Sequence, residues 1–236
     1  MTLKNFKTGF LFAVDVDEDP ESASGYKPAE RHYGTGPWPS HLGKKLYGDL
    51  RIQGALAALQ MGFIERLVLP GKNEKRFGPD KRVMIDGEMS LLWQGWAIRE
   101  MLIKDHGVSS DQLIWIPSTG TTSDAASVMK RFFNENPDLF PDGQAAFITN
   151  HYHVDRAGED LRTAGLYPNI FAAERFIIAA AETEVERQRR KMHIFGVLSE
   201  PGYVARIIDE LQGGASKVLG VYDSTPFKQG WDKPAR

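Results

Sequence analysis

The sequence predicts an α/β protein of the Rossmann-like, doubly wound class, in which a mostly parallel sheet carries helices on both faces. Short apolar runs alternate with longer segments of helical periodicity through most of the chain, which is the pattern of parallel strands joined by crossover helices. Two of these runs end abruptly at polar clusters, as strands do where they enter a binding loop. The expected strands cover residues 9–14, 66–69, 112–116, 145–149 and 170–173.

Two segments have the apolar spacing of helices. The first lies between the first two strands, and its apolar residues share one sheet-facing stripe that is expected to end at Gly62. Its apolar members are Ile52, Ala55, Leu56, Leu59 and Phe63. The segment 89–103 is apolar around most of its circumference, which predicts a helix that is deeply buried or lies at an oligomer interface. The chain is therefore a candidate homo-oligomer.

Composition bounds the kind of protein. The 236 residues are 42% hydrophobic and 25% charged, as in ordinary soluble globular chains. With 29 Lys and Arg against 31 Asp and Glu, the charge gives no reason to expect nucleic-acid binding. Cysteine is absent, which excludes disulfides and thiolate chemistry. The early apolar run 9–14 is too short for a signal peptide or a membrane span. We expect a cytoplasmic protein without membrane contact.

The sequence predicts one domain with a long irregular loop and a C-terminal arm. Residues 1–223 are expected to form a single α/β domain, and residues 224–236 a C-terminal arm. Residues 15–41 lack periodicity and contain several glycines and prolines. Irregular connections of this length in compact domains are often lids, so this loop is expected to cover the binding pocket, with His32 and Trp38 as candidate contacts.

The polar clusters after the third and fourth strands are expected to meet, because the carboxyl ends of parallel strands share one edge of the sheet. This would bring Thr122 and His153 into one pocket. Free amide groups at the start of the helix near Ser123 favour an anion such as phosphate or carboxylate. The alternative is ordinary helix capping by Thr121 or Thr122.

His153 and Arg156 are three residues apart, which makes them neighbours on a helix and suits a proton donor beside an anion clamp. A plainer alternative is that His153 caps the helix while Arg156 pairs with Asp160. His151 and His153 would form a metal-ligand pair only if extended geometry continued through the residue between them.

Asp15 follows the first apolar run, a placement that resembles the nucleophile loop of haloacid-dehalogenase-type phosphatases, whose aspartate attacks phosphorus beside a magnesium ion. Asp19 stands where the threonine of that loop is expected. The alternative is a solvated or cation-binding loop.

Several landmarks between residues 46 and 166 together resemble the domain-of-unknown-function 218 family, the YdcF-like and SanA-like proteins. The most specific is the segment Ile148-Thr149-Asn150-His151-Tyr152-His153-Val154-Asp155-Arg156-Ala157. The others are Arg51 with its Ala-rich helix, Pro70-Gly71, Glu88, His106-Gly107-Val108, Ser118, Thr122 and Ala125.

The resemblance implies a Rossmann-like fold whose site residues gather at the carboxyl ends of the strands. The family is regarded as enzymatic without a generally assigned reaction, and is linked with S-adenosylmethionine-like ligands. This chain departs from it at Asp124, which replaces a usual asparagine, and at Asp15–Asp19, which replace a Gly-rich turn. The candidate substrate-binding residues are Arg51, Glu88, Ser118, Thr122, Asp124, Thr149, Asn150 and Arg156.

The expected function is hydrolysis or group transfer on a small phosphorylated or nucleotide-like anion, with His153 as acid or base. One alternative is a protein that binds a nucleotide-like or S-adenosylmethionine-like ligand without turnover. The other is a metal-dependent phosphatase that uses Asp15 as nucleophile. The sequence does not identify a cofactor.

Overall fold

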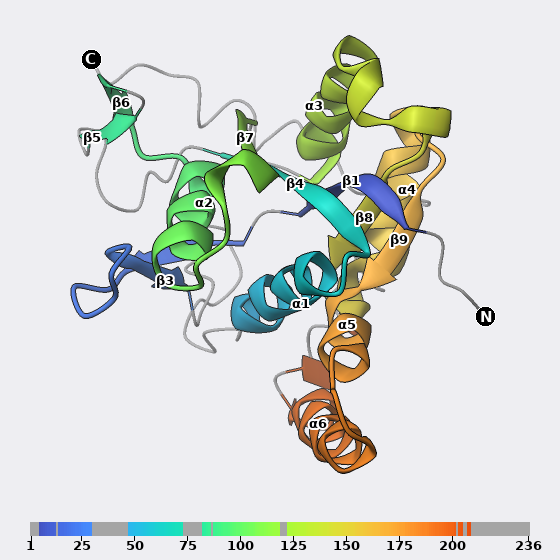
Figure 1. Ribbon diagram of the computed structural model, residues 1–236. Helices are drawn as coiled ribbons and strands as arrows, with labels where there is room; N and C mark the ends of the chain where they lie inside the picture. The colour runs from blue at the N-terminus through green and yellow to red at the C-terminus, as the bar shows by residue number, and fades with distance from the viewer. Residues whose placement is uncertain are drawn as a thin grey trace.

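A five-stranded parallel sheet forms the centre of the computed structural model (Figure 1), with strand order β7-β4-β1-β8-β9. Its strands are β1 (Phe6–Leu11), β4 (Ile64–Gly71), β7 (Leu113–Pro117), β8 (Ala146–Thr149) and β9 (Asn169–Ala172). The structure describes residues 5–12, 14–29, 47–72, 82–85, 87–118, 122–201, 203–204 and 207–208. Each strand overlaps one that the sequence predicts, so the predicted fold class is confirmed.

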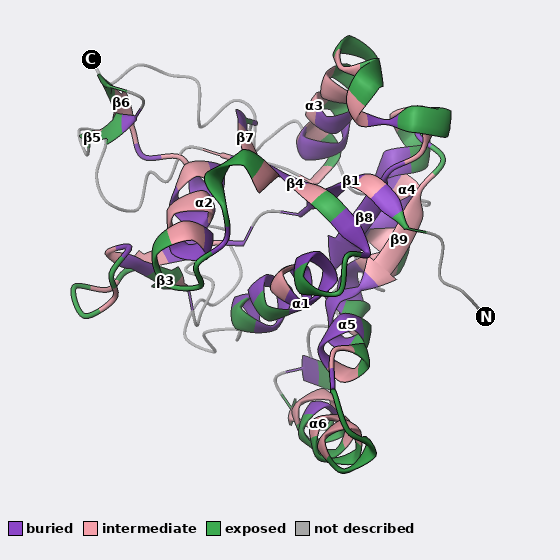
Figure 2. Ribbon diagram, viewed as in Figure 1, coloured by how far each residue is buried: buried purple, intermediate pink, exposed green. Residues whose placement is uncertain are grey.

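The strands are apolar on both sides because helices cover both faces of the sheet. β8 is buried along its whole length and β1 at every residue except Lys7, and Figure 2 shows buried residues at the centre of the sheet. Phe10 and Phe147 face one side and stack at 5.2 Å between ring centroids. Leu11 and Ile148 face the other side. Alternation along each strand thus supplies two separate cores.

Helices α1, α2 and α5 cover one face of the sheet, and α3 and α4 cover the other. Helix α6 packs on α5 at the lower end of the molecule in Figure 1. Their bounds are α1 (Gly48–Gln60), α2 (Gln94–Lys104), α3 (Thr122–Glu135), α4 (Val154–Thr163), α5 (Ala173–Ala179) and α6 (Glu184–Leu198). Short 3-10 turns are η3 (Ser110–Gln112), η4 (Pro137–Leu139), η5 (Pro141–Gly143) and η6 (His151–His153).

The apolar stripe predicted before Gly62 lies on α1, where Ile52, Ala55 and Leu59 are buried. Gly62 follows the helix with a φ of 64°, a left-handed conformation that favours glycine. Phe63 is therefore outside the helix, although it is buried in the same core.

The helix predicted over residues 89–103 begins five residues later than expected, at Gln94. Residues Arg82–Ile85 (β5) and Glu88–Leu91 (β6) form an antiparallel hairpin instead. The apolar count alone does not separate a strand followed by a helix from one long helix. The start of α2 is fixed by close packing, since a Cβ on Gly95 would lie 2.2 Å from the Leu69 carbonyl oxygen.

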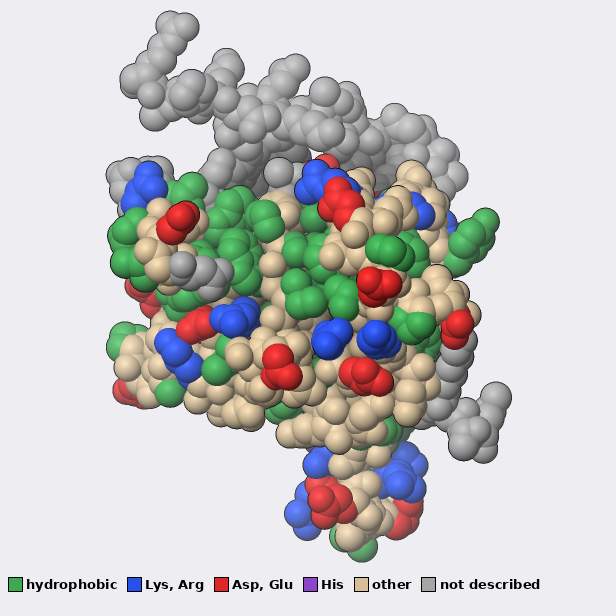
Figure 3. All heavy atoms as spheres, turned by 45° about the horizontal axis from the view of Figure 1, so that its top comes forward, with side chains coloured by type: hydrophobic (Ala, Val, Ile, Leu, Met, Phe, Trp, Pro, Cys, Tyr) green, Lys and Arg blue, Asp and Glu red, His purple; other side chains and the backbone are tan. Residues whose placement is uncertain are grey.

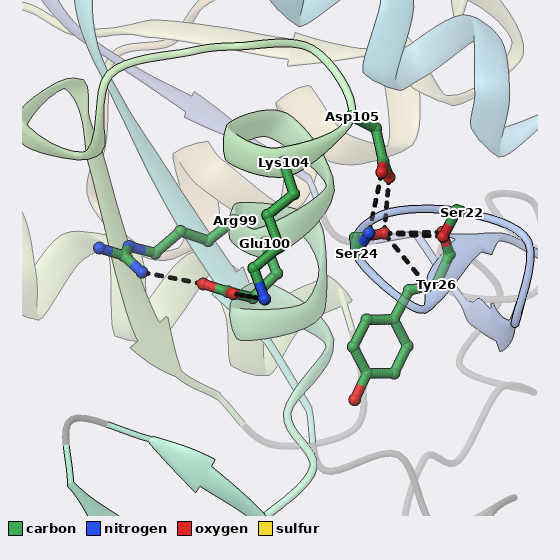
Figure 4. Close-up of polar contacts among 7 residues, drawn as sticks. All are labelled: Ser22, Ser24, Tyr26, Arg99, Glu100, Lys104 and Asp105. Carbon is green, nitrogen blue, oxygen red and sulfur yellow. Dashed lines mark hydrogen bonds and ion pairs between the residues drawn. The ribbon is translucent and has the colours of Figure 1, made fainter.

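A second hairpin, β2 (Val16–Glu18) and β3 (Tyr26–Pro28), occupies much of the loop that was expected to be an irregular lid. It packs on α2, where the Tyr26 and Trp96 rings meet edge to face. The Ser24 amide and hydroxyl donate to the Asp105 carboxylate at the carboxyl end of α2 (Figure 4). That end leads toward the start of β7, away from the carboxyl edge of the sheet. The tip of the hairpin therefore packs on the end of α2, and the lid role of residues 15–41 stays a prediction.

The same hairpin explains why α2 is apolar around most of its surface, because the sheet covers one side of it and β2–β3 another. His32 and Trp38, the predicted lid contacts, lie outside the described residues, as do residues 209–236 with the predicted C-terminal arm.

Replacing Gly54 by alanine should destabilise the fold. The new Cβ would lie 2.5 Å from the Ala173 Cβ, so α1 and α5 would have to separate. We expect a loss of about 1–3 kcal/mol in the free energy of unfolding, measured by urea denaturation, despite the better helix propensity of alanine.

Gly158→Ala in α4 is the matched control, because its Cβ would meet only the flexible Arg162 side chain, at 3.6 Å or more. This variant should be neutral or more stable by up to about 1 kcal/mol. A Gly54→Ala protein as stable as Gly158→Ala would contradict the packing of α1 on α5.

Candidate functional site

The carboxyl ends of β1 and β8 form the topological switch point of the sheet. The chain continues from β1 toward β4 on one side and from β8 to β9 on the other. In doubly wound folds, ligands bind outside the carboxyl ends of the strands at such a point. The residues that follow these two strands are therefore the first to consider.

Asn150 ties the ends of both strands to the start of α1. Its side chain is fully buried, and its Oδ1 accepts a hydrogen bond from Arg51 Nε at 2.8 Å. Its Nδ2 donates to the Tyr47 carbonyl oxygen at 3.2 Å. Arg51 Nη1 donates in turn to the carbonyl oxygen of Phe12, just after β1, at 3.2 Å. The guanidinium and the amide thus hold three chain segments together.

Glu174, in the first turn of α5, extends this network. Its carboxylate is 3% exposed and accepts from the His151 backbone N–H, at 3.0 Å to Oε2, and from Tyr203 Oη, at 2.8 Å to Oε1. Asn150 Nδ2 also donates to Glu174 Oε1, at 3.4 Å. These bonds offset the cost of burying a carboxylate. They also fix the turn η6 that leads into α4.

His153 ends that turn and is 7% exposed, and its ring meets the Phe12 ring edge to face with 5.8 Å between the ring centroids. Its backbone N–H donates to the Asn150 carbonyl oxygen at 2.9 Å. It occupies the N-cap position of α4, but its side chain makes no capping hydrogen bond to the described helix, so the predicted capping role is wrong. His151 is exposed, so the two imidazoles lie in different surroundings.

Arg156 links the first turns of two helices, because its Nη2 donates to Thr122 Oγ1, the first residue of α3, at 3.3 Å. The expectation that the third and fourth strands lie close together is wrong, since β4 and β1 separate β7 from β8. Thr122 and Arg156 meet because α3 and α4 pack on the same face. His153 lies three residues before Arg156, at the same edge.

Two buried hydroxyl side chains lie at the ends of β7 and β8. Ser118 follows β7, is 6% exposed, and its backbone N–H donates to the Gly71 carbonyl oxygen at 2.9 Å. Thr149 ends β8 and is fully buried, and its hydroxyl has no hydrogen-bond partner among the described residues. A buried hydroxyl in this state is costly unless a ligand or water satisfies it.

Asp15 lies at the same edge, beside α2. Its Oδ1 accepts from Gln94 Nε2 at 2.8 Å and is 3.3 Å from Lys72 Nζ. The Asp15 and Lys72 side chains are 13% and 35% exposed, so the pair is partly open to solvent. Within the described ranges, no group of three or more His, Asp or Glu side chains is placed to hold a metal ion. The nucleophile role of Asp15 stays a prediction.

Two predicted site residues, Glu88 and Asp124, are not part of the hydrogen-bond network around Asn150 among the described contacts. Glu88 is exposed at the start of β6, and no described contact joins it to the switch point. Asp124 is half-buried in the first turn of α3. The sequence reasoning missed Glu174, Tyr203, Tyr47 and Gln94. Glu174 left one signal, a carboxylate at the first turn of a helix within a mostly apolar segment.

The fold and this edge of the sheet together define an α/β protein of the doubly wound class with a polar switch point. Searches of protein-family models, curated proteins and solved structures find no significant match to the chain. None of the helices in the described part of the chain combines the length and apolar character needed to cross a bilayer.

Asn150→Ala should cost about 3 kcal/mol in the free energy of unfolding, because it removes the acceptor of the buried Arg51 Nε and the amide that donates to the Tyr47 carbonyl. Asn169→Ala is the control. Asn169 makes one long bond, 3.4 Å, to the Ala145 carbonyl oxygen at the other end of the sheet. Its loss should cost about 1 kcal/mol or less by urea denaturation. Equal losses in the two variants would show that the network does not stabilise the fold.

We expect Tyr203 to make the free energy of unfolding depend on pH in the alkaline range. Burial and the Glu174 carboxylate raise the pKa of Tyr203 above its usual 10.0. As the pH rises, the Tyr203 hydroxyl therefore loses its proton in the unfolded chain before it does so in the folded protein. Its contribution to the free energy of unfolding is fully present below about pH 10. Above that pH the free energy of unfolding falls by about 1.4 kcal/mol per pH unit. Tyr203→Phe should reduce that slope between about pH 10 and 11. If the free energy of unfolding fell equally steeply with pH in the wild type and in Tyr203→Phe, the titration of Tyr203 would not be the cause.

Proposed function

We propose that this protein binds a small phosphorylated or nucleotide-like anion at the carboxyl edge of its sheet, between the starts of α3 and α4. The contact between Arg156 and Thr122 carries the proposal, since it joins two helix N-termini at the carboxyl edge of the sheet. Free backbone amides and the helix dipole favour an anion at each N-terminus. A guanidinium at their junction adds a fixed cation that can bind two oxygens at once.

The proposed ligand carries more than a bare phosphate. Asp124, in the first turn of α3, would repel a second anionic group but can accept from a hydroxyl or amine. Thr149 offers a buried hydroxyl that needs a partner. Sugar phosphates and nucleotides combine an anion with hydroxyl donors, which suits this set of side chains. The resemblance to the YdcF-like family points to the same class of ligand.

His153 is the proposed acid or base in hydrolysis or group transfer, because imidazole titrates near neutral pH and lies three residues from the anion clamp. A second candidate is a binding protein without turnover, which the burial of His153 favours. A phosphatase that uses Asp15 would require magnesium, so assays with and without the ion separate it from the first proposal.

The proposal is tested first by thermal melting with inorganic phosphate, sugar phosphates, nucleotides and S-adenosylmethionine. A ligand at about 100 times its dissociation constant stabilises by about 2.7 kcal/mol. The strongest ligand is then titrated by calorimetry. Turnover that is lost in His153→Gln while binding remains would support the enzyme; binding without turnover in the wild type would support the second candidate.

Arg156→Lys should weaken this binding tenfold or more, about 1.4 kcal/mol, because lysine keeps the charge but not the planar fork. Arg162→Lys, an exposed arginine in the last turn of α4, is the control and should bind as the wild type does. Equal affinities for wild type and Arg156→Lys would remove Arg156 from the site.

A further inference from the structure

Helix α6 carries an apolar ridge on its outer surface. Val185, Met192 and Phe195 are 73%, 74% and 65% exposed, while Ile194 on the opposite side is 3% exposed. Val185 and Met192 are seven residues apart, so successive steps of about 100° bring them to nearly the same side of the helix. Figure 2 shows that α6 is far less buried than the other long helices. Large exposed apolar side chains that gather on one helix face mark an interaction surface.

A groove of about 810 Å³ runs beside this ridge, between α1, α5 and α6. Leu56, Ala57, Ile177 and Ala180 give it an apolar floor, and Arg189 and His193 of α6 stand on its rim. Ridge and groove therefore lie next to each other on one side of the molecule. In a two-fold symmetric interface the same patch of both copies meets itself, so a surface of this kind is a candidate for such an interface.

The charges of α6 and the turn before it run from acidic to basic along the chain. Glu182, Glu184 and Glu186 come first, and Arg187, Arg189, Arg190 and Lys191 follow. Figure 3 shows acidic and basic side chains together on this lower part of the molecule. Arg187 pairs with Glu184 and Arg190 with Glu186 within the helix, whereas Arg189 has no carboxylate partner among the described residues. Two such helices attract each other when antiparallel and repel when parallel.

We propose that α6 is the centre of a two-fold symmetric homodimer, in which the helices of two copies pack antiparallel and each ridge lies against the partner's ridge, beside the groove. Pairing Val185 with the Met192 of the other copy puts the two-fold axis between Gln188 and Arg189. This register sets Glu186 opposite Lys191 and Glu184 opposite His193. The helix of 15 residues is about 22 Å long, enough for a continuous contact between the two ridges.

The oligomeric state of the full chain, measured by sedimentation at several concentrations, tests the proposal. The wild type should be a dimer and Met192→Glu a monomer, because the carboxylate would be buried between the two helices, against Val185 of the other copy. Met84→Glu replaces a methionine that is 58% exposed on the β5–β6 hairpin and should remain a dimer. A wild type that is monomeric at all concentrations, or that forms open-ended assemblies, would overturn the proposal.

Single cysteines test the register, because the natural chain has none. Oxidised Gln188→Cys should form a covalent dimer, since position 188 lies beside the axis. Val185→Cys should not, because its two copies would be about 10 Å apart along the antiparallel helices, too far for a disulfide. Efficient cross-linking of Val185→Cys would show parallel helices and contradict the model of the interface. If Met192→Glu lowers the melting temperature of a monomeric wild type, the ridge is covered by its own chain and the dimer is excluded.

Discussion

The hydrogen bonds of Asn150 are the constraint on which the rest of the switch point depends. A parallel sheet leaves its strand ends as open loops, and the loops after β1 and β8 diverge to opposite sides of the fold. Asn150 holds the starts of these loops together, because it accepts from Arg51 and donates to the Tyr47 carbonyl oxygen and to Glu174. Because an asparagine amide has both an acceptor and donors, one side chain connects a buried cation to a buried anion.

This arrangement has a consequence for chemistry. Arg51 and Glu174 are both buried, so their charges are expensive unless every bond is kept. The network therefore resists rearrangement, and it fixes the His151 amide and the start of α4. His153 and Arg156 lie at the start of α4, so the network also fixes their positions. A rigid shell of this kind is what a binding site needs if its side chains are to meet a ligand without further ordering.

The sequence was sufficient for the sheet but not for the hairpins. Each of the five sheet strands contains a short apolar run, which is the pattern of a strand buried between two layers of helices. Strands β2, β3, β5 and β6 have only three or four residues each. They form because of distant contacts, such as Ser24 with Asp105, which are 81 residues apart in the chain. No local pattern contains such a contact.

The site residues also fall into a group that could be predicted from the sequence and a group that could not. Arg51, Asn150, His153 and Arg156 were predicted, because they follow strands or match the resemblance to the YdcF-like family. Glu174 was missed because its role depends on the His151 amide, 23 residues earlier, and on Tyr203, 29 residues later. The expected adjacency of the third and fourth strands was wrong, because strand order cannot be read from a sequence whose loops allow several arrangements.

The central claim is that the starts of α3 and α4 form one anion site, and backbone amide NMR tests it most directly. The described amides of residues 122–124 and 154–156 should shift together as inorganic phosphate or a nucleotide is added, and should saturate with a single dissociation constant. Amides at the start of α6, which also has free N–H groups, should not follow that curve. Shifts of equal size at every helix start, or none at α3 and α4, would contradict the account.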